Sequence, residues 1–216
     1  MVIFDCDGVL VDSERLSHQV LVDMLAERGV ALGFDEAVEL FIGASIGVGM
    51  VKVRELLGGH VPDGFLPEMG RRTREAFRAG LTVVPGIVAL LDALQRPFCV
   101  ASNGNHAKVN FTLGHTGLLP RFAGRIFTAE DVAHPKPAPD LFLHAARAMG
   151  AEPRHTTVVE DTPTGVTAAK AAGMRAIGYA AMTPAARLHA AGADAVVLTM
   201  AEVQALLATD RRGGAP

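Results

Sequence analysis

The chain has 216 residues, of which 50% are hydrophobic and 20% charged, and its formal net charge is −3. This composition is typical of a globular protein and not of a disordered chain, and the negative charge argues against a nucleic-acid binder. No apolar run reaches the roughly 18 residues of a membrane span, and the N-terminus lacks the basic segment of a signal peptide. Two cysteines make a poor disulfide framework. We therefore expect a cytoplasmic protein, monomeric, that binds neither nucleic acid nor membrane.

The first part of the chain predicts one short strand and then only helices. Residues 1–4 form an apolar run that stops at Asp5, as in a buried strand. Ser13 is the expected N-cap of a helix whose apolar residues recur at helical spacing until Gly29. The helical pattern continues to residue 79 with three breaks, at residues 43–49, at residues 58–59 and near Pro62.

After residue 80 the pattern changes to alternating strands and helices. Further strands are expected at residues 98–101, 125–128, 157–159, 176–179 and 195–198. Helices are expected at residues 86–94, 139–149 and 162–172, and the tail, residues 209–216, is expected to be frayed. This alternation predicts an α/β fold, a Rossmann-like, mainly parallel sheet. We expect a core domain of residues 1–13 and 81–216, with an all-helical cap domain, residues 14–80, inserted after the first strand.

Polar residues follow three of the predicted strands: Asp5 with Asp7, Ser102 with Asn103, and Glu160 with Asp161. In an open parallel sheet, ligands bind outside the carboxyl ends of the strands. These residues are therefore expected to converge although they lie far apart in the chain. Lys136, in a loop between two such strands, is expected to join them.

The acidic residues of this group suggest both a catalytic pair and a metal site. Asp5 and Asp7 are two apart, which in an extended chain places both side chains on one face. One carboxylate can then act as nucleophile and its neighbour as general acid and base, although turn chemistry alone also explains acidic residues at a strand end. Four carboxylates in one site would repel one another, by about 4 kcal/mol per pair at ~4 Å and an effective dielectric near 20. Such a cluster needs a cation, and hard oxygen ligands favour Mg²⁺.

The remaining polar residues suggest a place for a phosphate. Lys136 lies in the sequence HPKPAP, whose prolines stiffen the loop and would hold the amine opposite the metal. Ser102, Asn103 and Gly104 offer a hydroxyl, an amide and accessible backbone N–H groups, although such a tripeptide is often only a turn. Cys6 lies between two carboxylates, which would raise its pKa and argues against a reactive thiolate.

Taken together, these segments resemble the four motifs of the haloacid dehalogenase superfamily. Residues 5–14, DCDGVLVDSE, resemble the first motif, and Ser102-Asn103-Gly104 the second. Lys136 in KPAPD resembles the third motif, and residues 160–165, EDTPTG, the fourth. The helical insertion is similar to the cap of the subfamily that holds β-phosphoglucomutase and many sugar-phosphate phosphatases. The residues around Ser102 look most like the 6-phosphogluconate phosphatase branch.

The resemblance implies a role for each motif residue. Asp5 would attack phosphorus to form an aspartyl-phosphate, and Asp7 would protonate the leaving oxygen and then deprotonate water. Mg²⁺ would be held by Asp5, the Asp7 carbonyl and Asp161, with Glu160 ligating directly or through water. The phosphoryl group would be bound by Ser102, Asn103 and Lys136. The expected function is a Mg²⁺-dependent phosphatase of small phosphorylated metabolites, such as sugar or sugar-acid phosphates.

The sequence fits three alternative functions less well. A haloacid dehalogenase lacks the acid at the position of Asp7, and an inactive binding module would not need all four motifs. A β-phosphoglucomutase-type mutase carries a histidine at the position of Ser17, and this chain has a histidine only at the next position, His18. Such a mutase also has the cap motif Lys-Gly-x-Ser-Arg, where this chain has IGASI at residues 42–46. Both basic cap residues are absent, which favours hydrolysis. Ser45, Lys52 and Arg54 are candidate substrate contacts in the cap, although surface solvation is the better explanation for each of the two charged residues.

Overall fold

The computed structural model of the protein describes residues 1–44 and 46–209. The chain divides into two compact units, Met1–Val11 with Val83–Pro216, called here the core unit, and Asp12–Thr82, called the helical unit. The helical domain expected from the sequence, residues 14–80, is therefore two residues shorter at each end than the helical unit of the structure.

The core unit contains a parallel sheet of six strands in the order β3-β2-β1-β4-β5-β6. The strands are β1 (Val2–Phe4), β2 (Phe98–Ser102), β3 (Ile126–Thr128), β4 (Thr157–Glu160), β5 (Arg175–Tyr179) and β6 (Ala195–Val197). All six were predicted, and each end lies within one residue of its predicted position. The chain builds the sheet outward from β1 on one side and then from β4 on the other. The carboxyl ends of β1, β2 and β4 therefore meet at the point where the strand order reverses, the usual ligand site of such sheets.

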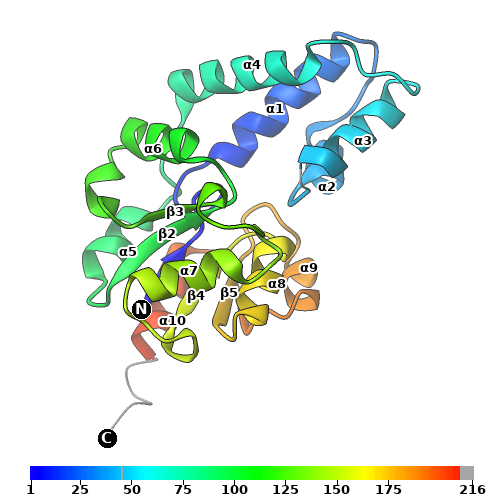
Figure 1. The fold of residues 1–216 in the computed structure, drawn as a ribbon. Helices are drawn as coiled ribbons and strands as arrows, with labels where there is room; N and C mark the ends of the chain where they lie inside the picture. Colours follow the sequence, from blue (N-terminus) through cyan, green and yellow to red (C-terminus); the bar gives the residue numbers. More distant parts are fainter. Residues whose placement is uncertain (45, 210–216) are drawn as a thin grey trace, which may run out of the picture. The chain divides into compact units, whose positions relative to one another are not determined.

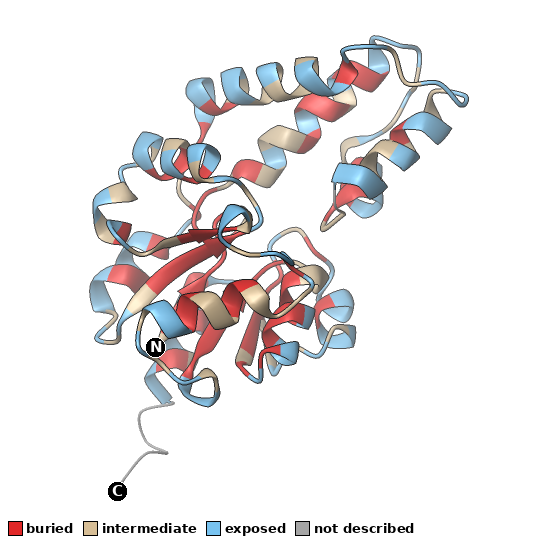
Figure 2. Ribbon diagram, viewed as in Figure 1, coloured by how far each residue is buried: buried red, intermediate tan, exposed pale blue. Residues whose placement is uncertain are grey.

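Helices cover both faces of this sheet. The helices are α5 (Ile87–Ala93), α6 (His106–His115), α7 (Asp140–Ala148), α8 (Pro163–Ala171), α9 (Ala185–Ala190) and α10 (Met200–Thr209). Figure 1 shows α7 and α8 side by side on the near face, where their apolar residues pack with Ile3, Cys99 and Val158 of the central strands. Strands β1, β2, β4 and β5 are buried along almost their whole length (Figure 2), as expected for a sheet covered on both faces, and the edge strand β6 is partly exposed.

Three short 3₁₀ helices complete the core unit. They are η1 (Leu119–Phe122), η2 (Ala129–Asp131) and η3 (Pro153–His155). Helices α6, α9 and α10 were not among the elements predicted from the sequence. Thr209, expected to begin a frayed tail, is the last residue of α10, and the rest of that tail lies outside the described residues.

The helical unit consists of α1 (Ser13–Ala26), α2 (Phe34–Phe41), α3 (Ile46–Leu56) and α4 (Phe65–Gly80). Residues 12–44 and 46–82 contain no strand, as predicted. Its apolar core is formed mainly by α1, with Phe41, Val53 and Phe65 from the other three helices. On its surface, Arg72 of α4 joins this helix to the C-cap of α1 through an ion pair with Glu27, and it also pairs with Glu68 within α4.

Two local predictions in the helical unit were wrong. Ser13 is the first residue of α1 and not its N-cap, because the N-cap, Asp12, is held outside the helix: its N–H donates to the Thr82 carbonyl at 3.0 Å, next to the antiparallel bridge between Val11 and Val83. The predicted break at residues 43–49 is confined to its first residues, since α3 begins at Ile46 and includes Gly47 and Gly49. Burial of Val53 against the helical core outweighs the low helix propensity of these glycines.

Among the described residues, no helix is long and apolar enough to cross a bilayer.

Candidate active site

The loop after β1 places Asp5 and Asp7 at the carboxyl edge of the sheet. Asp5 continues the pairing of β1, because its N–H donates to the Val159 carbonyl of β4 at 3.0 Å. The chain then turns back on itself: the N–H groups of Leu10 and Val11 both donate to the Cys6 carbonyl, at 2.9 and 3.1 Å. Asp7 therefore lies at the start of a tight loop and not in a regular strand, so its position depends on this turn.

Lys136 connects three strand ends through its buried ammonium group. Its Nζ donates to Asp5 Oδ1 at 2.6 Å, to Glu160 Oε1 at 2.8 Å and to the Ala101 carbonyl at 2.9 Å. Its side chain is 3% exposed, and those of Asp5 and Glu160 are 10% and 2% exposed. An ammonium group has three donors, so every donor of Lys136 is used. The structure thus brings together three residues predicted for the site from β1, β4 and the intervening loop.

The backbone of Lys136 is fixed by Asn103. The Asn103 side chain donates from Nδ2 to the Lys136 carbonyl and accepts at Oδ1 from the Lys136 N–H, both at 3.0 Å. This two-point contact places the lysine loop against the turn that follows β2. In the same turn, the Gly104 N–H donates to the buried Ser102 Oγ at 3.0 Å. The prediction had used Asn103 for phosphate binding and had not assigned its side chain this role.

Glu160 is held on both of its carboxylate oxygens. While Oε1 accepts from Lys136, Oε2 accepts from the N–H and the hydroxyl of Thr162, both at 2.8 Å. Thr162 is also the N-cap of α8, since its hydroxyl accepts from the Gly165 N–H at 3.1 Å. A Cβ at Gly165 would lie 1.8 Å from Glu160 Oε1, so this position must be glycine for the carboxylate to lie where it does. In this arrangement Glu160 orients Lys136, and ligation of a metal ion by Glu160 stays a prediction.

A second lysine, which the sequence analysis did not select, contacts Asp7. Lys108 of α6 donates from Nζ to Asp7 Oδ2 at 2.8 Å. The two residues are 101 positions apart, so nothing in the sequence near either residue signals the contact. The only available signal was that Lys108 lies on the helix that follows the Ser102–Gly104 turn.

The site contains more buried negative charge than its two lysines balance. Burial, with a further contribution from the negative charges of Glu160 and Asp7, raises the pKa of Asp5 to about 8 against the lowering effect of Lys136. Burial acts to lower the pKa of Lys136, but the carboxylates of Asp5 and Glu160 outweigh it and hold the pKa above its usual value. Lys136 is therefore a permanent cation, while the ionised form of Asp5 needs further positive charge.

Asp161 adds a fourth carboxylate beside the first motif. Gly8 has a φ of +75°, and a Cβ built there would lie 2.1 Å from Asp161 Oδ2 and 2.7 Å from its Cγ. The buried Asp161 carboxylate thus occupies the space that a side chain at residue 8 would fill. A positive φ and this close approach both require glycine.

These donors fit a magnesium ion. Among the described residues, no three His, Cys, Asp or Glu side chains form a ready-made metal-binding group. Mg²⁺ is usually bound through one or two carboxylates together with water and substrate phosphate, and not by a closed protein cage. Asp5 precedes this turn in the chain and the Asp161 carboxylate packs against Gly8, in a site short of positive charge, which suits that mode of binding.

Neither cysteine is a candidate nucleophile. Cys6 is buried, and burial followed by the charges of Asp7 and Asp5 raises its pKa well above the usual value, as predicted. Its Sγ lies 3.7 Å from Thr112 Oγ1, which anchors the first motif to α6. Burial also raises the pKa of Cys99, to about 12.

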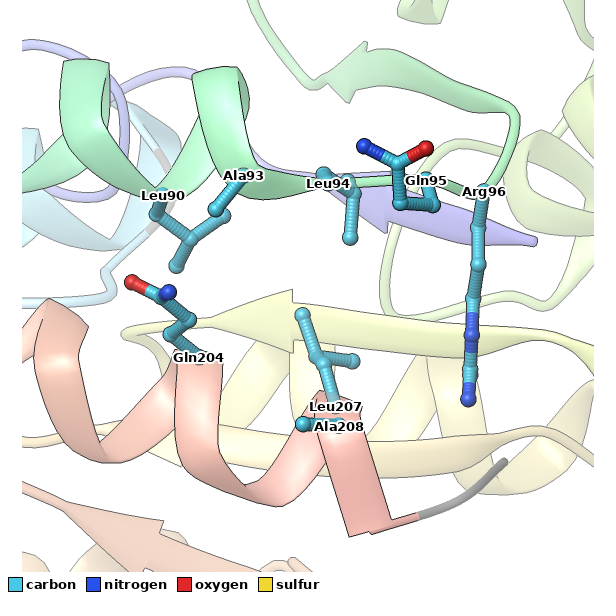
Figure 3. A pocket seen from close by; sticks show the side chains of 8 residues that line it. All are labelled: Leu90, Ala93, Leu94, Gln95, Arg96, Gln204, Leu207 and Ala208. Atoms are coloured by element: carbon cyan, nitrogen blue, oxygen red, sulfur yellow. The ribbon is translucent and has the colours of Figure 1, made fainter. Parts of the chain in front are cut away.

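The core unit has a hollow of about 170 Å³ between α5 and α10 that carries no such chemistry. Figure 3 shows the side chains that line it, which are Leu90, Ala93, Leu94, Gln95, Arg96, Gln204, Leu207 and Ala208. Arg96 is its one charged side chain, and it lies just before β2 begins at Phe98. The hollow is therefore at the amino edge of the sheet, away from the carboxylates.

Comparison with known proteins agrees with this geometry. The family model of haloacid dehalogenase-like hydrolases matches residues 1–173. The chain belongs to this family. It is 32% identical to 6-phosphogluconate phosphatase of Escherichia coli over 182 residues, 83% of this chain and 82% of the relative. It is 31% identical to hexitol phosphatase A of the same organism, over 87% of this chain and 86% of the relative.

A solved structure with this fold comes from Agrobacterium tumefaciens, a conserved haloacid dehalogenase-like protein. It is 34% identical, with a TM-score of 0.91 over 97% of this chain and 98% of the other. As a haloacid dehalogenase-like hydrolase similar to several phosphatases, the protein is a phosphoric monoester hydrolase.

The close approach at Gly8 gives a direct test of the site geometry. We expect Gly8→Ala to lower kcat/KM by about tenfold or more, because the new Cβ displaces Asp161 or Asp7 from its place. Gly173→Ala is the matched control, since Gly173 has a similar φ of +71° but nothing within 4 Å of the added Cβ. Both variants carry a left-handed strain of about 1–2 kcal/mol. Equal activity of the two variants, measured with their melting temperatures, would contradict the assigned geometry.

Proposed function

We propose that the protein is a Mg²⁺-dependent phosphatase of sugar or sugar-acid phosphates that works through an aspartyl-phosphate on Asp5. The observation that carries this proposal is the pair of acidic residues at the end of β1, each held by a different lysine. Lys136 contacts the buried Asp5, and Lys108 contacts the more accessible Asp7. The carboxyl groups of Asp5 and Asp7 thus lie in different environments, one buried and one more accessible. A nucleophile and a general acid need such different environments.

In the first step, an Asp5 carboxylate oxygen attacks the phosphorus of the substrate. A bond forms between this oxygen and phosphorus, and the bond from phosphorus to the ester oxygen breaks. The electron pair of that bond goes to the ester oxygen, which takes a proton from the Asp7 carboxyl group and leaves as an alcohol. Lys136 holds Asp5 in place for the attack, since its Nζ lies 2.6 Å from Asp5 Oδ1.

In the second step, water attacks the phosphorus of the aspartyl-phosphate. Asp7, now a carboxylate, accepts a proton from this water, and the bond between phosphorus and Asp5 breaks. Inorganic phosphate leaves, and Asp5 is again a carboxylate while Asp7 is again protonated. Asp7 therefore serves as acid and then as base without any net gain or loss of protons.

The transferring phosphoryl group needs donors and positive charge around its oxygens. We assign the donors to the Ser102 hydroxyl and the Asn103 backbone, and the positive charge to the Lys136 ammonium group, whose own hydrogen bonds go to Asp5, Glu160 and the Ala101 carbonyl. The hydrogen bonds from Asn103 to Lys136 support this assignment, because they hold the second and third motifs together as one unit. A structure of a relative from Deinococcus radiodurans, 32% identical with a TM-score of 0.84, contains bound phosphate.

Magnesium would be held by Asp5, Asp161 and the Asp7 carbonyl, with Glu160 near it or bridged by water. When bound, it neutralises charge on the phosphoryl oxygens and on the carboxylates around them. The raised pKa of Asp5 supports this assignment, because it reflects a buried carboxylate with too little positive charge nearby.

The substrate class rests on the relatives. The names of two of them state action on 6-phosphogluconate and on hexitol phosphates, and that of a third, 30% identical over 81% of this chain, on fructose 1-phosphate. We therefore propose a phosphorylated sugar, sugar acid or polyol as substrate. The individual compound is to be found by assay over such a panel.

The side chains of the helical unit favour hydrolysis over a phosphosugar mutase. At the two positions that are basic in the mutase motif, Ile42 is buried and Ile46 is exposed. Two neighbouring basic residues, which are the candidates to replace them, have contacts inside the unit. His18 is buried, and its Nδ1 lies 2.8 Å from the Glu14 carbonyl oxygen. Lys52 donates a hydrogen bond to the Leu40 carbonyl. Arg54 is exposed, and Ser45 lies outside the described residues. A second phosphate would need basic partners that these contacts do not offer.

Removal of the metal ion tests the charge argument. We expect phosphate release to stop in EDTA and to return when excess Mg²⁺ is added, because the carboxylates would otherwise repel a phosphate dianion. Ca²⁺ should inhibit, since its larger and looser coordination misplaces the nucleophile. Activity that is unchanged in the chelator, with metal content checked by atomic emission, would contradict the proposed metal site.

A second assay separates hydrolysis from isomerisation. The protein is incubated with β-glucose 1-phosphate and a catalytic amount of glucose 1,6-bisphosphate, and both glucose 6-phosphate and free phosphate are followed. We expect phosphate release from several monophosphates and no isomerisation, because the described residues of the helical unit lack the two basic partners of the mutase motif. Isomerisation faster than phosphate release would overturn the assignment as a phosphatase.

A further inference from the structure

Lys108 is the one lysine besides Lys136 for which a contact with the proposed catalytic residues is resolved among the described residues. Its Nζ lies 2.8 Å from Asp7 Oδ2, with Lys108 41% exposed and Asp7 15% exposed. The four motifs do not include Lys108, and the steps proposed above do not use it. A partly exposed ion pair of this kind adds little to stability, so the importance of this contact lies in where it holds Asp7.

The position of Lys108 is fixed by the turn that carries the second motif. Its backbone N–H donates to Asn105 Oδ1 at 2.8 Å, which makes Asn105 the N-cap of α6. The next residue, Val109, is fully buried and anchors the first turn of the helix. Lys108 therefore begins from a rigid helix end and not from a mobile loop.

The side chain of Lys108 also has a defined path. A Cβ built at Gly104 would lie 3.3 Å from both Lys108 Cδ and Ser102 Oγ. The alkyl part of Lys108 thus passes over Gly104, beside the serine proposed to bind phosphate, before its ammonium group reaches Asp7. This path joins the second motif to the first.

We infer that Lys108 is a positioning residue that sets the orientation of Asp7 for proton exchange with the leaving oxygen. The hydrogen bond to Oδ2 restricts rotation of the carboxyl group, so that Asp7 meets the ester oxygen in one orientation. Proton transfer by a well-placed group contributes about 10²–10⁴-fold to a rate, and a small displacement can lose much of it. This inference rests on the proposed role of Asp7.

The test compares substrates that differ in their need for an acid. The alkyl substrate is whichever of 6-phosphogluconate, the hexitol phosphates and the hexose phosphates is turned over fastest. The second substrate is p-nitrophenyl phosphate, whose leaving group departs as a stable anion and needs little protonation. The parameter is kcat/KM at saturating Mg²⁺, because it covers only the steps up to release of the leaving group.

Four variants are compared with the wild type. Lys108→Met removes the charge and keeps the alkyl length, and Lys108→Arg restores a cation. Lys170→Met is the matched control, because Lys170 forms a similar half-exposed ion pair, 2.7 Å from Asp194 Oδ1, at the surface of the same unit. Asp7→Asn tests the proposed function itself.

We expect Lys108→Met to lower kcat/KM for the alkyl phosphate by about 10–100-fold and for the aryl phosphate by less than about threefold. Lys108→Arg should recover most of the loss, and Lys170→Met should match the wild type. An equal loss on both substrates, or a loss below about twofold on the alkyl phosphate, overturns the inference. If Asp7→Asn discriminates between the substrates and Lys108→Met does not, only the inference fails. If Asp7→Asn lowers kcat/KM equally for both substrates, the acid role of Asp7 is contradicted, and the inference about Lys108, which rests on that role, is contradicted with it.

Discussion

The buried ammonium group of Lys136 donates hydrogen bonds to Asp5 after β1, to the Ala101 carbonyl in β2 and to Glu160 at the end of β4. Burying a charge is costly unless it is paired and all its hydrogen bonds are made. Here one cation satisfies two buried carboxylates and a main-chain carbonyl at once. Removal of Lys136 would leave two buried carboxylates without their shared cation, so the three strand ends depend on the lysine loop.

The rest of the site keeps this arrangement in place. Asn103 holds the backbone of Lys136, and Thr162 holds the second oxygen of Glu160 while it caps α8. Gly8 and Gly165 leave the space that Asp161 and Glu160 occupy. The four motifs are thus parts of one network of hydrogen bonds and close contacts at the point where the strand order of the sheet reverses. In such a network, positioning and charge supply most of what phosphoryl transfer needs.

Much of the core unit was predictable because its determinants are local. The strands are short, mostly apolar runs, and polar residues follow three of them. The alternation of strands and helices, and the convergence of Asp5, Lys136 and Glu160, therefore follow from the sequence and from the rule for parallel sheets. The contact of Lys108 with Asp7 was not predictable, because it joins residues 101 positions apart through the path of one side chain. The start of α1 was misplaced for a similar reason, since the pairing of Asp12 with Thr82 decides it.

The measurement that tests the account most directly is the identification of the phosphorylated residue during turnover. The protein is mixed with substrate and Mg²⁺, quenched in acid and treated with borohydride, which reduces an aspartyl-phosphate to homoserine. Peptide mass spectrometry then locates the modified residue, with Asp5→Asn as the control. The account predicts homoserine at position 5 in the wild type and none in the variant. Steady turnover with no modification at position 5, or modification at another residue, would contradict it.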